Sequence, residues 1–302
     1  MTENIENGGP RWSVAAGCGI TLGIFLIWII VFYSFEFLYL LFFHESEIFS
    51  LPLAISVTIL SLLFTLGTLQ ILRLNPLKIS GLQFSIMSVP GFFVGTIVGA
   101  LGIAATLLCF TLMSRLSYSD LLYHCEEEII GGQNVWIISS MIALFACVEE
   151  IIFRGLLYPL LKRSVGIVSA MFLSALAFSA MHIFNPDFQI IAAFNIFLAG
   201  VFLCLMMEIG GNLYVACGAH FGWNMAQVVA GLPMSGYRIA YENQMWGLEI
   251  HGPDYLTGGN FGIEASLVCS IVLVAMIVIL TLILIHRKFD EETTQKGNPV
   301  FQ

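Results

Sequence analysis

The sequence has few charged residues, since only 10% of its 302 residues are Asp, Glu, Lys or Arg. Soluble domains carry about 25% charged residues. Hydrophobic residues make up 58% of the chain, and the mean hydropathy is +0.92. One soluble core cannot remove that much apolar surface from water, whereas a lipid bilayer can. The composition therefore excludes an ordinary soluble domain and predicts an integral membrane protein.

Basic clusters and paired cysteines are also absent. The chain has 11 Lys and Arg against 20 Asp and Glu, a net charge of −9, which argues against nucleic acid as a partner. Its seven cysteines form no C-x-x-C pair, and most lie in apolar runs. This pattern argues against a disulfide framework and against a cysteine-ligated zinc site.

Eight apolar segments are long enough to cross a bilayer, which takes about 20 residues. They are 13–42, 51–73, 90–114, 135–160, 165–184, 190–208, 212–232 and 265–286. The pattern predicts an all-α polytopic membrane protein of about eight transmembrane helices, forming a single membrane domain over residues 1–302. A polar N-terminal segment (1–12), a long loop (233–264) and a polar C-terminal tail (287–302) complete this organisation.

Lysine and arginine gather on one side of this predicted topology. The side of both termini holds Arg11, Arg73, Lys78, Lys162, Arg163, Arg287, Lys288 and Lys296, and the other side holds Arg115 and Arg238. Basic residues mark the cytoplasmic side of membrane proteins. Both termini are therefore predicted to be cytoplasmic.

Three glycines recur at four-residue spacing in the third apolar segment: Gly91, Gly95 and Gly99. This spacing places them on one helix face, where another helix can approach closely. We expect the face to pack against a helix of the same chain. A homodimer interface is the alternative.

Seven ionisable residues lie inside the apolar segments, where they are costly and usually have a function. They are Glu36, Glu149, Glu150, Arg154, His182, Glu208 and His220, with Asn224 as a polar neighbour. Glu36 and Glu208 lie near the ends of their segments and are expected at the membrane interface. The others are hard to explain together by packing alone, so the sequence predicts a polar catalytic cavity in the bundle.

The spacing of these residues divides their roles. Arg154 follows Glu150 by four residues, so the two share one helix face and are expected to pair. Glu149 points about 100° away and stays free to take a proton from water. His220 and Asn224, also four residues apart, project from one face, where two donors could hold a developing oxyanion.

His182 ends the fifth segment, where a neutral imidazole can exchange a proton or bind a metal. Taken alone, His182 or His220 is more simply explained by a hydrogen bond between helices. The different depths of Glu149 and His182 in the membrane pose a second difficulty. Glu149 falls near the middle of its segment and His182 near the outer end of its own, so they meet only if the fifth helix is tilted, offset or longer.

Three ordered motifs carry a resemblance to a known family. They are Glu149-Glu150-x-x-x-Arg154, Phe178-x-x-x-His182 and His220-x-x-x-Asn224. The set resembles the motifs of the type II CAAX prenyl endopeptidase and bacteriocin-processing family, also called the Abi family. The resemblance covers about residues 135–225, the expected catalytic core, and the stretch 256–264 is similar to a segment of prokaryotic members.

This resemblance implies an eight-helix membrane fold and peptide-bond hydrolysis within the membrane. The implied roles are water activation by Glu149 and His182, oxyanion binding by His220 and Asn224, and structural support by Glu150 and Arg154. The implied substrate is a membrane-associated or lipidated peptide or protein, surrounded by membrane lipids. The prokaryotic-like stretch favours a prokaryotic cell membrane.

The residue types leave metal dependence open. Glu149, His182 and His220 would make a three-ligand zinc site with a position free for water. Asn224 is a poor zinc ligand, however, and the sequence lacks the H-E-x-x-H spacing that puts two ligands on one helix. Water activated by glutamate without a cofactor is favoured, with zinc as the alternative.

Two other functions fit the same residues. Because a fold does not fix a function, the chain could be a non-proteolytic membrane scaffold or a bacteriocin-immunity protein. Buried glutamate and histidine also suit a proton or ion pathway. That pathway ranks last, because the ionisable residues form one cluster and not a chain across the bilayer.

Overall fold

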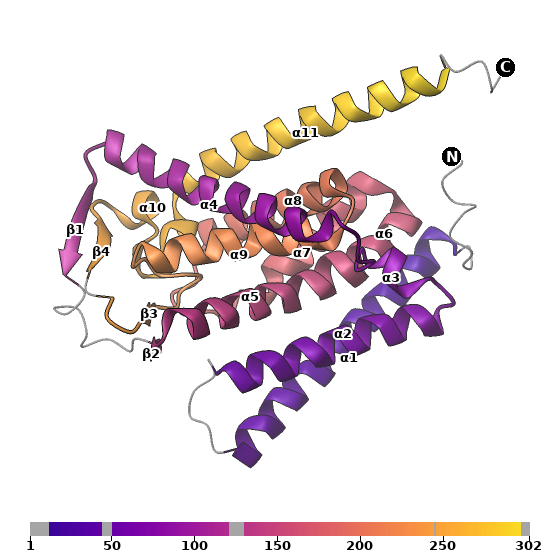
Figure 1. Cartoon of the computed structure of the whole chain (residues 1–302), viewed down its shortest axis with the longest axis horizontal. Coiled ribbons are helices and arrows are strands. Elements are labelled where there is room, and N and C mark those ends of the chain that lie inside the picture. The colour runs from indigo at the N-terminus through magenta and orange to yellow at the C-terminus, as the bar shows by residue number, and fades with distance from the viewer. Residues whose placement is uncertain (1–11, 44–49, 121–129, 245, 297–302) are drawn as a thin grey trace.

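The computed structural model describes residues 12–43, 50–120, 130–244 and 246–296. Long helices lie alongside one another, and α1 begins and α11 ends at the same end of the bundle (Figure 1). Short strands cluster at the opposite end (Figure 1). These two ends are called the terminal end and the strand end below.

The long helices coincide with the eight apolar segments, so the all-α prediction is confirmed. They are α1 (Val14–Phe43), α2 (Leu51–Ile71), α4 (Ser88–Leu112), α5 (Val135–Ile152), α6 (Tyr158–Val165), α7 (Ile167–Met181), α8 (Ile190–Gly210), α9 (Leu213–Val229) and α11 (Leu267–Lys296). A π-helical turn (Phe153–Leu157) joins α5 to α6 in one continuous helix. Short α3 (Pro76–Ile79) lies between α2 and α4.

Six helices of the described chain are long and apolar enough to cross a membrane, which makes it an integral multi-pass membrane protein. Two helices that match predicted transmembrane segments are not among these six: α7, with 15 residues, and α9, with 17. At 1.5 Å per residue, α7 is only about 22 Å long. The expected count of eight crossings therefore stays a prediction for these two helices.

The short α7 resolves the difference in depth between Glu149 and His182. A single residue, Gly166, joins α6 to α7, with a φ of 81° in the region that favours glycine. In a hairpin of antiparallel helices, residues equally far from the turn lie at the same level. Glu149 lies 17 residues before Gly166 and His182 lies 16 after it, so the hairpin brings the two side chains to the same level, with His182 Nε2 4.0 Å from Glu149 Oε2.

The glycine face of α4 packs against α9 of the same chain. A Cβ atom added to Gly95 would lie 2.1 Å from the Val215 carbonyl oxygen, and one added to Gly99 would lie 1.9 Å from that of Ala219. The contact is reciprocal, since a Cβ on Gly222 would lie 2.0 Å from the Thr96 carbonyl oxygen. The packing expectation is confirmed. Because α9 covers these glycines, their face of α4 is not free to form a homodimer interface.

Two small sheets lie in segments that the sequence indicated only as connections. Strand β1 (Leu116–Asp120) pairs antiparallel with β4 (Trp246–Ile250), and β2 (Ile130–Gln133) pairs parallel with β3 (Ile239–Tyr241). The remainder of loop 233–264 holds α10 (Asp254–Thr257) and two 3₁₀ turns. This loop is therefore folded, and it covers the strand end of the bundle.

Candidate active site

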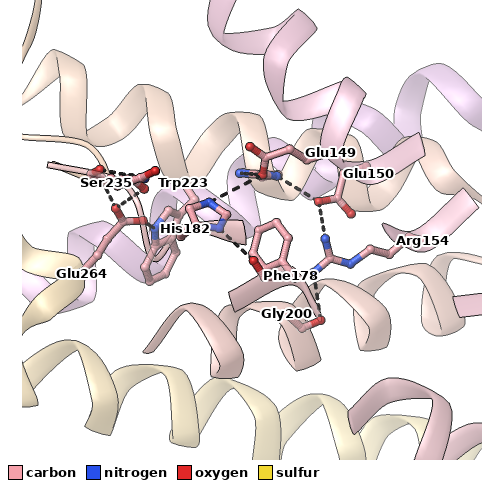
Figure 2. A network of polar contacts seen from close by, with 11 residues as sticks. Glu149, Glu150, Arg154, Phe178, His182, Gly200, Trp223, Ser235 and Glu264 are labelled. Atoms are coloured by element: carbon pink, nitrogen blue, oxygen red, sulfur yellow. Dashed lines mark hydrogen bonds and ion pairs between the residues drawn. The ribbon is translucent and has the colours of Figure 1, made fainter. Parts of the chain in front are cut away.

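Glu150 and Arg154 form a buried ion pair in the middle of the bundle. Arg154 Nη1 lies 2.9 Å from Glu150 Oε1, and both side chains are 0% exposed. Arg154 Nη2 also donates to the Gly200 carbonyl oxygen at 3.1 Å (Figure 2). The guanidinium carbon lies 4.4 Å from the centre of the Phe178 ring, a cation–π contact. The predicted pairing is confirmed, and it ties α5 to α8 and α7.

His220 joins this pair from α9. Its Nδ1 lies 2.9 Å from Glu150 Oε1. The Glu150 carboxylate is paired with Arg154 and can only accept a hydrogen bond, so His220 Nδ1 must carry the proton. In the neutral ring this leaves the lone pair on Nε2, which lies 3.8 Å from Glu149 Oε2.

His182 is oriented by a similar contact. Its Nδ1 donates to the Phe178 carbonyl oxygen at 2.9 Å, because a carbonyl oxygen only accepts. The Nε2 lone pair then faces Glu149, with Nε2 4.0 Å from Glu149 Oε2. The Phe178 ring packs edge-on against both imidazoles, with ring centres 4.8 Å from His182 and 6.0 Å from His220. Figure 2 shows Glu149, His182 and Phe178 converging from α5 and α7.

Within the described chain, Glu149 Oε2 is buried and accepts no hydrogen bond, and the same holds for Glu150 Oε2. Glu149 differs from Glu150 because the Oε1 atom of Glu150 is bound by Arg154 and His220. About a third of the Glu149 side chain, 34%, is exposed. Both imidazole Nε2 atoms therefore lie close to one carboxylate oxygen that is free to accept a proton. This arrangement suits a water molecule held between the three groups.

A small cavity adjoins the two histidines. Its volume is about 30 Å³, and its polar lining comes from His182, His220, Asn224, Ser235 and Glu264. Glu149 is outside this lining and approaches the histidines from α5. A single water molecule needs roughly 10–15 Å³ of such volume, so the cavity holds about two waters and no peptide.

Loop 233–264 forms the roof of the cavity through Ser235 and Glu264. Glu264 is 8% exposed and accepts hydrogen bonds from Trp223 Nε1 at 2.8 Å and from the Ser235 amide and hydroxyl at 2.7 and 2.8 Å. Asn185, three residues after His182, donates to the Ser235 carbonyl oxygen at 3.0 Å. The roof is thus fastened to the segments that carry Asn224 and His182.

Burial raises the pKa of the Tyr237 phenol in this loop above its ordinary value of 10.0, and the charges of Glu36 and Tyr33 add to the effect. The phenol therefore stays protonated at neutral pH.

Glu36 lies half-buried on α1, and Glu208 lies near the terminal end of α8, where it binds Lys162 at 2.8 Å. Neither carboxylate belongs to the Glu149 cluster.

The six predicted site residues all converge here, from α5, its π-helical turn, α7 and α9. The sequence did not identify Ser235 and Glu264 as neighbours of the site. An acidic residue at the end of the prokaryotic-like stretch, just before the last apolar segment, was the available signal for Glu264.

Glu149, His182 and His220 remain the groups nearest to a metal-ligand set. Two ligand atoms on one tetrahedral zinc ion lie about 3.3 Å apart. The observed separations from Glu149 are 4.0 and 3.8 Å, so a zinc ion would need these side chains to move closer together. Among the described residues, no group of three His, Cys, Asp or Glu side chains has a metal-holding arrangement.

Residues 131–226 match the family model described as Rce1-like type II CAAX prenyl endopeptidase. The match covers about a third of the chain, and over this segment the chain is similar to the CAAX-type endopeptidases of this family. The matched segment contains α5 to α8, most of α9 and all six predicted site residues. Ser235, Glu264 and the remainder of the roof lie outside it. No curated protein and no solved structure matches the chain.

Proposed function

We propose that Glu149 and His182 activate a water molecule that hydrolyses a peptide bond within the membrane. The observation that carries this proposal is the convergence of both imidazole Nε2 atoms on the unpartnered Oε2 of Glu149. Water between them donates one hydrogen bond to Glu149 and one to His182 Nε2. Attack on the substrate carbonyl then transfers the first proton to Glu149, forming a carboxylic acid and a tetrahedral oxyanion.

Asn224 and His220 are suited to bind this oxyanion. Asn224 offers an amide N–H from the cavity wall. His220 must act as the imidazolium, because its Nδ1 proton is already given to Glu150, and Glu150 offsets the added charge. Glu149 returns its proton to the leaving amine when the C–N bond breaks, which restores the carboxylate.

Glu150 and Arg154 support this chemistry without entering it. Their pairing leaves Glu150 as the acceptor that fixes the His220 ring. The proposed reaction needs no metal, because carboxylate, imidazoles and carboxamide together supply the base and the oxyanion donors. Treatment with a strong chelator is expected to leave cleavage unchanged. Loss of cleavage, restored by zinc, would instead support a zinc-bound water at Glu149, His182 and His220.

The purified protein in detergent provides the test, with a pool of internally quenched, mixed-sequence peptides. Wild type is expected to cleave, and Glu149→Ala and His182→Ala are expected to lose about 10²–10⁴-fold in rate. Glu242→Ala removes an exposed carboxylate of the loop that lines neither cavity, and it serves as the matched control. In ¹⁸O-labelled water each cut should place one ¹⁸O in the new carboxyl group. Unchanged cleavage by Glu149→Ala would refute the assignment.

A further inference from the structure

Two side chains of the roof, Ser235 and Glu264, line the catalytic cavity without a part in the proposed reaction. They share that lining with His182, His220 and Asn224, the residues suited to bind the water and the oxyanion. The Glu264 carboxylate already accepts three hydrogen bonds. The hydroxyl oxygen of Ser235 is therefore the roof atom with more capacity left for a ligand.

Ser235 has a backbone conformation that turn chemistry does not favour for serine. Met234 and Tyr237 exchange two backbone hydrogen bonds of 2.9 Å, which close a two-residue turn. Its central residues, Ser235 and Gly236, have φ angles of 50° and 90°. Two positive φ angles are typical of a type I′ turn, where Asn, Asp and Gly are preferred. Strained residues of this kind cluster at functional sites, so the serine side chain is what needs an explanation.

The turn is also held in place from both sides. A Cβ atom added to Gly236 would lie 2.3 Å from the Pro186 carbonyl oxygen, so the turn packs closely against the segment that follows α7. Asn185 of the same segment donates to the Ser235 carbonyl oxygen at 3.0 Å. The position of Ser235 relative to His182 is thus fixed by short-range contacts.

Hydrogen bonds also set the direction in which the Ser235 hydroxyl acts. Both the hydroxyl and the backbone N–H of Ser235 donate to Glu264 Oε2, at 2.8 and 2.7 Å (Figure 2). A serine hydroxyl has one proton to donate and two lone pairs that can accept. The proton is given to the carboxylate, and no residue of the described chain donates to Oγ. Ser235 Oγ therefore offers the cavity an acceptor and no donor.

The cavity has room for one peptide group. Its volume is about 30 Å³ and one water needs roughly 10–15 Å³, so a carbonyl oxygen and an amide nitrogen fit together. In a planar trans peptide group the C=O and the N–H point to opposite sides. His220 and Asn224 on α9 are suited to the carbonyl oxygen, which leaves the N–H for the roof. Ser235 Oγ is the acceptor that this N–H needs there.

We propose that Ser235 is a substrate-positioning residue whose Oγ accepts the N–H of the scissile peptide bond. The held N–H leaves the lone pair that forms on this nitrogen free for the proton that Glu149 returns. Glu264 contributes by keeping the hydroxyl proton of Ser235 out of the cavity. The substrate bond must then carry a hydrogen on its nitrogen, so proline or an N-methylated residue directly after the cut is disfavoured. This inference rests on the proposed function, because it adds one contact to the same reaction.

N-methylation of single peptide bonds tests the contact in the purified full chain. Mass spectrometry locates the cut in one cleaved peptide of the pool. One analogue is then N-methylated at the residue directly after the cut, and a second at the next residue, which carries the same added bulk. Wild type should show a kcat/KM at least about tenfold lower for the first analogue than for the second, the loss of a hydrogen bond to a charge-assisted acceptor.

Two variants remove the acceptor, Ser235→Gly and Ser235→Ala. Glycine adopts a φ of 50° without strain, so Ser235→Gly should keep the fold, and thermal unfolding in detergent checks this. In both variants the preference for the second analogue over the first should fall by about tenfold, because the variant and the methyl group remove the same bond. Asn243→Gly is the matched control, since Asn243 also has a positive φ, 64°, and is exposed in the same loop. It should keep the wild-type preference.

Equal cleavage of the two analogues by wild type would overturn the inference, whatever the variants do. The same holds if the preference persists in both Ser235 variants. In either case cleavage of the unmethylated peptide leaves the proposed function standing. Absence of cleavage of every unmethylated peptide by wild type would refute the proposed function itself, and the inference with it.

Discussion

The bundle has two unlike halves, and the boundary between them falls between Glu149 and Glu150. On the terminal-end side, Glu150 is fully buried and its Oε1 binds both Arg154 and His220 at 2.9 Å. On the strand-end side, Glu149 is one-third exposed, and its Oε2 lies 3.8–4.0 Å from the two histidines without a hydrogen bond from a described residue. The two adjacent carboxylates therefore differ because of the residues around them. Contacts hold Glu150 in place, whereas Glu149 is free to take part in the reaction.

The largest expected effect comes from removing the cation of the buried pair. Arg154→Met leaves the Glu150 carboxylate buried without its counter-charge, which should cost about 3–5 kcal/mol of unfolding free energy. Lys162→Met is the matched control, because Lys162 is 39% exposed in its pair with Glu208 and should cost less than about 1 kcal/mol. Chemical unfolding in detergent measures both. Equal losses would show that the terminal-end half is not specially dependent on its ion pair.

Asn224→Ala tests whether the strand-end half serves catalysis and not stability. Loss of one oxyanion donor should lower kcat by about 10²–10³-fold and leave KM and the thermal midpoint nearly unchanged. Steady-state kinetics with a single cleaved peptide from the pool provides the measurement. A rise in KM at constant kcat would place Asn224 in substrate binding and outside the oxyanion site.

Gly99→Leu tests the scaffold that holds α9 in place. Its side chain would collide with the Ala219 backbone, so a loss of about 1–3 kcal/mol or more is expected, together with reduced cleavage. Gly67→Leu on α2 is the control, since no other atom lies within 4 Å of a Cβ added there. If both variants behave alike in thermal unfolding and cleavage, the close contact of α4 with α9 is not what positions His220.

The smallest expected effect is at the roof. Glu264→Gln replaces a charged acceptor of three hydrogen bonds by a neutral amide and should cost about 1.5 kcal/mol in stability. KM should rise several-fold, because the loop that closes the cavity loosens, while kcat changes less. Glu242→Gln, exposed in the same loop and outside both cavities, should leave both constants unchanged. A variant Glu264→Gln with wild-type stability and KM would contradict the role of the roof.

Local sequence spacing was enough to predict the helices and the Glu150–Arg154 pair. Apolar run length determines where a membrane helix can form, and four-residue spacing determines which side chains share a face. Both are properties of one segment. The same reasoning placed Gly91, Gly95 and Gly99 on a packing face, but it could not say which helix covers it.

Contacts between distant segments could not be predicted in this way. The bond from His220 to Glu150 joins residues 70 apart, and the Trp223–Glu264 bond joins residues 41 apart. The level of His182 depends on the hairpin at Gly166 and on where α7 ends, neither of which an apolar run specifies. Glu264 lies in a polar loop, where a carboxylate is unremarkable until the fold buries it.

Matched carboxamide variants at the two adjacent glutamates test the central claim most directly. Cleavage rate and unfolding free energy are measured for Glu149→Gln and Glu150→Gln in the same preparation. We expect Glu149→Gln to lose about 10²–10⁴-fold in rate with no loss of stability, and Glu150→Gln to lose about 3–5 kcal/mol because Arg154 is left unpaired. Wild-type cleavage by Glu149→Gln, or equal destabilisation by both, would contradict the division of roles between the two halves.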